Sequence, residues 1–273
     1  RRVLFRSKVV IYMSNGLEQL ISGIGKAIKT VPEFYEDALQ PTVKETGKFV
    51  SRIPRAINAA FSGLDKWILI KEYSVDETKK LLAKKLKNVD PDKIVVPEAY
   101  VAVPAIQAIS YAMNSKELRN LYANLLAKSM NVDTKNTVHP AFVETIKQLS
   151  PEDAIFFKHI CPLPARPIVD VMLDLPSALT ITIAENANLF GKKYVNNFPL
   201  ALDNLCRLGL VNIPEGMWYG DGSLYTNLMD VLKKEYTLEK YKHINPSSTG
   251  ICFTKKRIDI TPYGQNFYNI CVK

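Results

Sequence analysis

The sequence has few of the residues on which metal centres, disulfide frameworks and membrane spans depend. Its 273 residues include three histidines and four cysteines. The cysteines have no CxxC spacing and stand at Cys161, Cys206, Cys252 and Cys271. That scatter argues against a disulfide framework and a zinc site. The nearest approach to a long uncharged apolar run, residues 99–115, is shorter than the ~20 residues of a bilayer-spanning helix. We therefore expect a soluble, cytoplasmic protein.

Motifs of the common enzyme classes are also missing, among them GxxxxGK[ST], GxGxxG, HExxH and GxSxG. His159 and Cys161 lie close together, but no second Cys/His pair accompanies them. This spacing predicts a buried neutral histidine and a structural cysteine instead of metal ligands. We expect no enzyme, no cofactor and no metal site. A hydrolase around His139 and its neighbouring carboxylates stays open as a less favoured alternative.

The net charge of +9 is concentrated at one end. Residues 1–12 carry four bases and no acid, whereas residues 91–163 are balanced at seven and seven. The opening RRVLFRS also looks like a translated sequencing adapter, so we expect residues 1–12 to be a non-native tail and the natural chain to begin near Met13. Without this tail, the charge argues only weakly for nucleic acid.

Residues 13–90 predict an amphipathic helical region. Apolar side chains recur every eleven residues at Leu17, Ile28, Leu39, Val50 and Phe61. Eleven residues make three helical turns at 3.67 residues per turn, so these positions share one face.

Prolines interrupt this region, which indicates several helical segments in series. A basic segment follows at residues 76–86, where four lysines flank three leucines. Such faces can pack on the protein or on a second copy, lie in a membrane interface, or bind a partner helix.

Residues 91–163 predict a helical unit with short connections. Pro104 can open one helix, and Asn114 or Ser115 can begin the next. A helix entry follows His139, whose ring can bond the local backbone. Ser150-Pro151-Glu152-Asp153 is a strong start signal, because it combines a capping hydroxyl, a proline and acids in the first turn.

Residues 164–273 predict a winged-helix-like α+β domain with a long insertion at residues 214–250. Prolines bracket an irregular stretch, and a helix over residues 198–209 ends at Gly209. Residues 224–236 predict another helix. Residues 251–253 and 258–260 alternate like the paired strands of a wing, and Thr261-Pro262 begins a closing helix.

A winged helix invites a nucleic-acid interpretation, for which the candidate contacts are Arg207, Lys255, Lys256 and Arg257. The net charge of residues 164–273 is only +2, which is poor for phosphate contacts. Protein contact therefore fits this domain better than DNA binding.

One long segment carries a family resemblance. Residues 97–154 contain ANLLAKSM, then an aspartate, and then VHPAFVETIKQLSP. This run, with FYEDALQPTVKETGKFV and LAKKLKNVDPDKIVVPE upstream, closely resembles the abortive-infection alpha family over about residues 30–160. The resemblance implies a bacterial protein of phage defence that acts inside the cell. It brings no established catalytic residues.

Four polar residues of this segment are candidates for a partner surface, namely Arg119, Asn124, Asp133 and His139. Their alternative role is to cap helices and close loops. Taken together, the sequence predicts a mainly α protein with an amphipathic N-terminal region, a helical middle unit and a winged-helix-like C-terminal domain. We expect a non-enzymatic interaction module that contacts a protein partner or itself, with the inner membrane surface as a further possible site. A nucleic-acid-binding regulator is the alternative.

Overall fold

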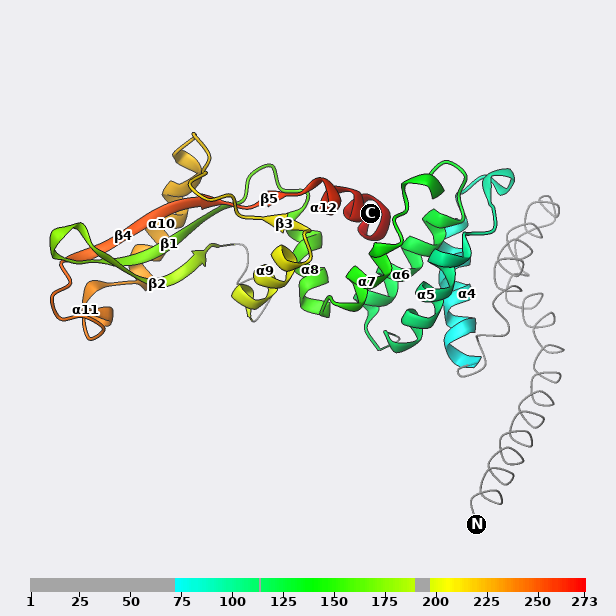
Figure 1. Ribbon diagram of the computed structural model, residues 1–273, viewed down its shortest axis with the longest axis horizontal. Helices are drawn as coiled ribbons and strands as arrows, with labels where there is room; N and C mark the ends of the chain where they lie inside the picture. Colours follow the sequence, from blue (N-terminus) through cyan, green and yellow to red (C-terminus); the bar gives the residue numbers. More distant parts are fainter. Residues whose placement is uncertain (1–71, 113, 190–196) are drawn as a thin grey trace, which may run out of the picture. The chain divides into compact units, whose positions relative to one another are not determined.

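The structure, a computed structural model, describes residues 72–112, 114–189 and 197–273, which are mainly helical and include a small antiparallel sheet (Figure 1). The helices are α4 (Glu72–Leu86), α5 (Ala99–Tyr111), α6 (Lys116–Ser129), α7 (Ala141–Lys147), α8 (Pro151–Ile160), α9 (Phe198–Arg207), α10 (Ser223–Glu235), α11 (Leu238–Tyr241) and α12 (Pro262–Phe267), with a closing π turn at Tyr268–Val272. The strands are β1 (Pro167–Asp174), β2 (Thr180–Ala187), β3 (Val211–Asn212), β4 (Gly250–Arg257) and β5 (Asp259–Ile260).

The chain divides into two units, Arg1–Glu72 and Tyr73–Lys273, of which the second is described below. The predicted tail at residues 1–12 lies outside the described residues, and so does the predicted apolar face of Leu17, Ile28, Leu39, Val50 and Phe61. Within the described ranges, no helix combines the length and the apolar character needed to cross a membrane.

The predicted helix starts follow from capping. Ser150 accepts a hydrogen bond from the Asp153 amide (3.0 Å), and Asp153 accepts one from the Ser150 amide (2.8 Å), which completes a capping box. Ser115 caps α6 through the Leu118 amide, and Thr261 caps α12 through the Gly264 amide. These three predicted starts are confirmed.

Helix α5 begins earlier than predicted. It starts at Ala99, and Pro104 lies inside it instead of at its first position. A proline there leaves the carbonyl of Tyr100 without its intrahelical donor. The side chain of Tyr100 is exposed, so water can reach this part of the first turn.

The helical part has a continuous apolar core. Helix α6 packs against α5, α7, α8 and the closing π turn. Fully buried aromatic rings of Phe142 and Phe157 lie beside Phe267 from α12, with centroids 5.4 Å and 5.9 Å away. The last helix of the chain therefore completes the core of the middle segment.

The larger sheet has the order β2-β1-β4, with all neighbours antiparallel. Helix α10 covers one face, where Tyr225, Leu228 and Leu232 pack on Val169 and Val171 of β1 (Figure 1). Alternation along the strands places the intervening side chains on the opposite face.

The predicted wing pairing is wrong. Residues 250–257 form one continuous strand on β1, and β5 pairs with β3. Ile258, which separates the two strands, is fully buried, and its amide donates to the carbonyl of Arg166. The stretch predicted as irregular forms the hairpin β1–β2, because its β-branched runs find a partner strand nearby.

Candidate functional site

Asn124, a predicted surface residue, is buried, with 8% of its surface exposed. Its side-chain amide donates to the carbonyl of Cys271 across 2.7 Å. The bond ties α6 to the closing π turn. Asn124 therefore holds two segments of the fold together and does not lie on an exposed surface.

His139 has the local backbone role that its position before Pro140 predicted. Its Nδ1 accepts a hydrogen bond from the Ala141 amide at the start of α7 (3.1 Å). The ring is exposed, and its edge lies against Tyr263 of α12. Its neighbours are thus a helix end and an aromatic ring.

Asn124 and His139 belong to one arrangement, which we call the socket of α12. Its further members are Thr145, whose hydroxyl bonds the Tyr263 hydroxyl (2.7 Å), and Phe142, whose ring lies 5.3 Å from that of Tyr263. The side chains from α6 and α7 converge on α12 and the turn that follows it. Asn124, His139 and Thr145 thus help to hold α12 and the π turn in place.

The other two predicted partner residues have different surroundings. Asp133 lies in an exposed loop and accepts a hydrogen bond from Lys93 (2.7 Å). Arg119 is half-buried on α6. None of the described contacts of Asp133 is with α12, so the four candidates do not form one site.

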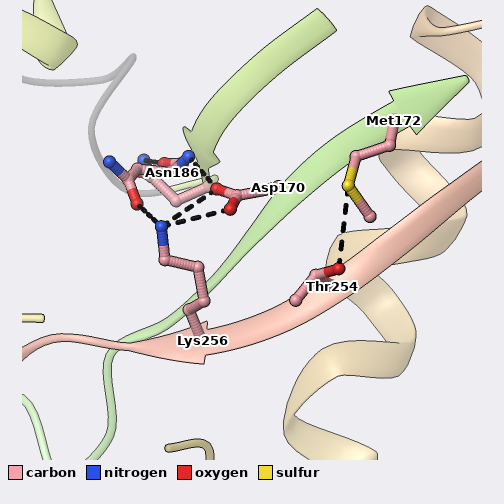
Figure 2. A network of polar contacts seen from close by, with 6 residues as sticks. Asp170, Met172, Asn186, Thr254 and Lys256 are labelled. Atoms are coloured by element: carbon pink, nitrogen blue, oxygen red, sulfur yellow. Dashed lines mark hydrogen bonds and ion pairs between the residues drawn. The ribbon is translucent and has the colours of Figure 1, made fainter. Parts of the chain in front are cut away.

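Lys256 and its neighbours form a polar cluster on the sheet face opposite α10. Its ammonium lies 3.1 Å and 3.2 Å from the two Asp170 carboxylate oxygens and donates to the Asn186 side chain (2.7 Å). Figure 2 shows Lys256 reaching from β4 across β1 toward the end of β2. Asn186, at a positive φ of 54°, donates a hydrogen bond from its backbone amide to the Asp170 carboxylate. The charges of Lys256 and Asp170 are paired with each other, and because the three residues come from β4, β1 and β2, the cluster joins three strands.

Lys255 and Arg257, two further predicted nucleic-acid contacts, lie on the sheet face that α10 covers. The ammonium of Lys255 sits 5.4 Å from the centre of the Tyr225 ring, and Arg257 lies over Tyr219 while pairing with Asp259 (3.1 Å). Lysine and arginine over aromatic rings are stabilised by cation–π attraction. Lys255 and Arg257 therefore face away from Lys256, and the three cations do not form one basic stripe.

Arg207, the fourth candidate for nucleic acid, bonds within the protein. Its guanidinium donates to Asn204 (2.7 Å) and to Gln148 (2.7 Å). Asn204 in turn donates to the buried Asp153 carboxylate. This chain of bonds joins α9 to the start of α8.

The cysteine thiols remain protonated at neutral pH. Burial raises the pKa of Cys161 to about 11 and that of Cys271 well above its ordinary value. Burial, followed by the Asp174 carboxylate, raises the pKa of Cys252 to about 11. Burial and Asp203 raise the pKa of Cys206, against a smaller opposite effect of Lys256. Since the thiolate is the nucleophile and the metal ligand, these sites suit neither role.

Histidine and carboxylate positions do not suggest a metal site in the described parts of the chain, where no three metal-ligating side chains gather. The prediction that His159 is buried is wrong, whereas the neighbouring Cys161 lies inside the protein. His159 is exposed near the end of α8.

Sequence reasoning missed the role of Arg166. Its guanidinium donates to the carbonyls of Ile160, Cys161 and Leu163, each across 2.7 Å. Its own amide donates to the Tyr219 hydroxyl. An arginine shortly after a helix is a common partner for the last carbonyls, so the signal was present in the sequence.

An exposed apolar pair was also missed. Met217 and Trp218 are 51% and 54% exposed in the loop before α10. The following residue, Tyr219, is anchored through its amide to the Tyr225 hydroxyl (3.0 Å). Large apolar side chains held outward on an anchored loop are typical of contact surfaces.

The comparisons with known proteins give one match. A family model described as abortive infection alpha matches residues 70–271, about three-quarters of the chain. No curated protein and no solved structure matches it. The match includes the C-terminal part, which the sequence resemblance had left out, and does not include residues 30–69, which it had covered. Because α12 closes the helical core, the two parts belong to one structural unit.

Proposed function

Since the chain belongs to the abortive infection alpha family, we propose that it is a phage-defence effector that acts by physical contact and not by catalysis. In this proposal, it works in the bacterial cytoplasm or at the inner face of the membrane. Its partners are a protein, a second copy of itself or the lipid surface. It requires no cofactor.

One observation carries the non-enzymatic part of the proposal. Two polar residues of the family segment that could perform chemistry, His139 and Asp153, are engaged in bonds that hold the fold. His139 receives the Ala141 amide, and Asp153 receives the Ser150 amide and the Asn204 side chain. A general base needs its acceptor atom aimed at a substrate proton, and these acceptors are aimed at the protein.

In the proposal, contact with a membrane or a second copy belongs to the N-terminal region. A helix over the eleven-residue repeat would carry Leu39, Val50 and Phe61 on one apolar face. Burying three such side chains in lipid would contribute about 1.5–3 kcal/mol each. The repeat is therefore the simplest candidate for a membrane contact that would kill the infected cell.

Contact with a protein belongs, in the proposal, to the C-terminal part. The two-stranded sheet of β3 and β5 lies between α9 and α12 in chain order, as a winged-helix-like domain would have it, with α10, α11 and β4 inserted between its strands. The exposed Met217 and Trp218 lie in that insertion. Trp is among the residues that contribute most to protein interfaces. The nucleic-acid alternative has weaker support, since Lys256 and Arg257 are neutralised by Asp170 and Asp259.

The test is a phage challenge of bacteria that express the full chain, scoring both plaques and survival of infected cells. We expect fewer plaques together with early death of infected cells. His139→Ala should keep this activity, with His243→Ala as the matched control for an exposed histidine. A folded His139→Ala variant that loses defence while His243→Ala keeps it would contradict the non-enzymatic proposal.

The N-terminal contact has its own test. Changing Leu39, Val50 and Phe61 to Asp in the full chain should abolish liposome binding, because carboxylates do not enter the lipid. Circular dichroism should show that the helical content of residues 73–273 is retained. Liposome binding by this folded variant would overturn the membrane contact of the repeat.

A further inference from the structure

Helix α4 carries a dense row of lysines. Residues 79–87 contain five lysines and no acid, and Lys80, Lys84, Lys85 and Lys87 are exposed. Lys80 and Lys84 are four residues apart and share one side of the helix, and Lys87 lies in the turn directly after α4. We call Lys80, Lys84, Lys85 and Lys87 the lysine face of α4.

The apolar side of the same helix is occupied. Leu82 and Leu86 are fully buried, and so is Thr78. Leu82 and Leu86 are therefore not available to lipid while the protein is folded. The exposed residues of the segment are mainly its lysines.

Three of the four lysines of this face have no counter-charge in the described part of the chain. Lys80 pairs with Glu77 (3.3 Å), but the described residues supply no ion pair for Lys84, Lys85 or Lys87. Partial burial lowers the pKa of Lys85, and the positive charges of Lys84 and of Lys158 on α8 lower it further. Like charges one turn apart disfavour a helix, so an anionic partner would relieve this repulsion.

We propose that the lysine face of α4 is a docking surface for a bilayer that contains anionic phospholipid. Clusters of four to eight basic residues on an amphipathic helix suit anionic headgroups, and each lysine adds to the attraction. The lysine face also directly follows the region in which the eleven-residue apolar repeat stands. The inference rests on the membrane contact in the proposed function and adds to it an electrostatic contact made by the described part of the chain.

The composition of the lysine face favours lipid over nucleic acid. Residues 79–87 contain neither arginine nor an aromatic residue. Arginine forks and stacked aromatic rings are the groups that proteins add for phosphate geometry and bases. Lysines alone attract negative charge without fixing its geometry, and a bilayer surface with many anionic headgroups meets that requirement.

The experiment is vesicle co-sedimentation of the full chain. The probes are vesicles of phosphatidylethanolamine with phosphatidylglycerol, and of phosphatidylethanolamine with phosphatidylcholine. The test variant changes Lys84, Lys85 and Lys87 to Gln. The control variant changes Lys116, Lys234 and Lys242, which are exposed on other elements, and thus removes the same charge. Duplex DNA is titrated in parallel.

We expect the unchanged chain to prefer phosphatidylglycerol vesicles and to lose affinity as salt rises. The test variant should bind them at least tenfold more weakly, and the control variant within twofold of the unchanged chain. Equal losses in both variants, no loss in the test variant, or a test variant that loses DNA binding while keeping vesicle binding would each overturn the inference. The Leu39, Val50 and Phe61 variant reports separately on the apolar repeat, so the two failures are distinguishable.

Discussion

Single side chains join segments that lie far apart in the sequence. Asn124 bonds Cys271, Tyr263 bonds Thr145, and Arg166 bonds three carbonyls at the end of α8. A buried or partly buried donor of this kind costs about 1–3 kcal/mol to lose, because its acceptor is left unsatisfied. At the residue scale, substitutions of these hydrogen-bonding side chains should lower the free energy of unfolding.

Among the described glycines, Gly264 has the least room for a side chain. A Cβ added there would overlap the backbone carbonyl of Leu210, and backbone does not yield as a flexible side chain can. We expect Gly264→Ala to lower the free energy of unfolding by about 3 kcal/mol, measured by urea denaturation.

Gly220→Ala is the matched control for this prediction. The space around Gly220 is open, with nothing within 4 Å of an added Cβ. Its free energy of unfolding should stay within about 0.5 kcal/mol of the unchanged chain. Equal effects of the two substitutions would contradict the close approach of α12 to Leu210.

The half-buried thiol of Cys252 should react slowly. With a pKa of about 11, about one thiol in a thousand is ionised at pH 8. The sign follows from burial, which disfavours the thiolate, so alkylation should accelerate tenfold per pH unit through pH 10. Mass spectrometry after iodoacetamide treatment measures this rate, and rapid labelling at pH 7 would contradict the raised pKa.

At the scale of elements, local chemistry predicted where helices begin and end. Ser150, Thr261 and Gly209 were recognisable because caps and left-handed helix ends depend on neighbouring residues. Gly209 has the positive φ of 68° that such an end requires. The pairing of β1 with β4 was not recognisable, since it joins residues about eighty positions apart and no local signal selects a distant partner.

For the candidate site too, contacts between neighbouring residues were predicted and contacts between distant residues were not. The backbone role of His139 was predicted because its partner, Ala141, is two residues away. The burial of Asn124 was not predicted, because its partner Cys271 lies 147 residues further along the chain. The opposite faces of Lys255 and Lys256 became clear only once β4 was known to be one continuous strand.

The turn between β1 and β2 is strained. Ser177 and Ala178 both adopt a positive φ, 69° and 57°, which costs a residue with a Cβ about 1–2 kcal/mol. Ala178→Gly removes this cost but loosens the unfolded chain, so we expect a net gain of about 0.5–1 kcal/mol in the free energy of unfolding.

Ala187→Gly provides the contrast for the turn. Ala187 lies in β2 and has no positive φ, so the same substitution should destabilise by about 0.5–1 kcal/mol. If thermal unfolding shows that Ala178→Gly raises the free energy of unfolding and Ala187→Gly lowers it, the strain in the turn is supported. The same sign at both positions would mean that glycine acts through the unfolded state alone.

At the scale of the whole molecule, the closing helix is part of the core. Deleting residues 262–273 would uncover Phe142 and Phe157, which are fully buried, and remove Tyr263 and Phe267. We expect this variant to lose cooperative unfolding and to bind a hydrophobic dye. Deleting residues 1–12, the predicted non-native tail, removes the same number of residues and should change neither property.

The last strands and helix have a consequence for how the protein is made. Residues 250–273 supply β4 to the large sheet, β5 to the small one and α12 to the helical core. A ribosome that adds about 5–20 residues per second therefore delivers all three missing pieces in its final seconds on this region. Incomplete chains released before that point have no finished sheet and an open core. Any activity that depends on the folded unit thus requires residues 250–273 to have been made, and products that end before them are left to proteases.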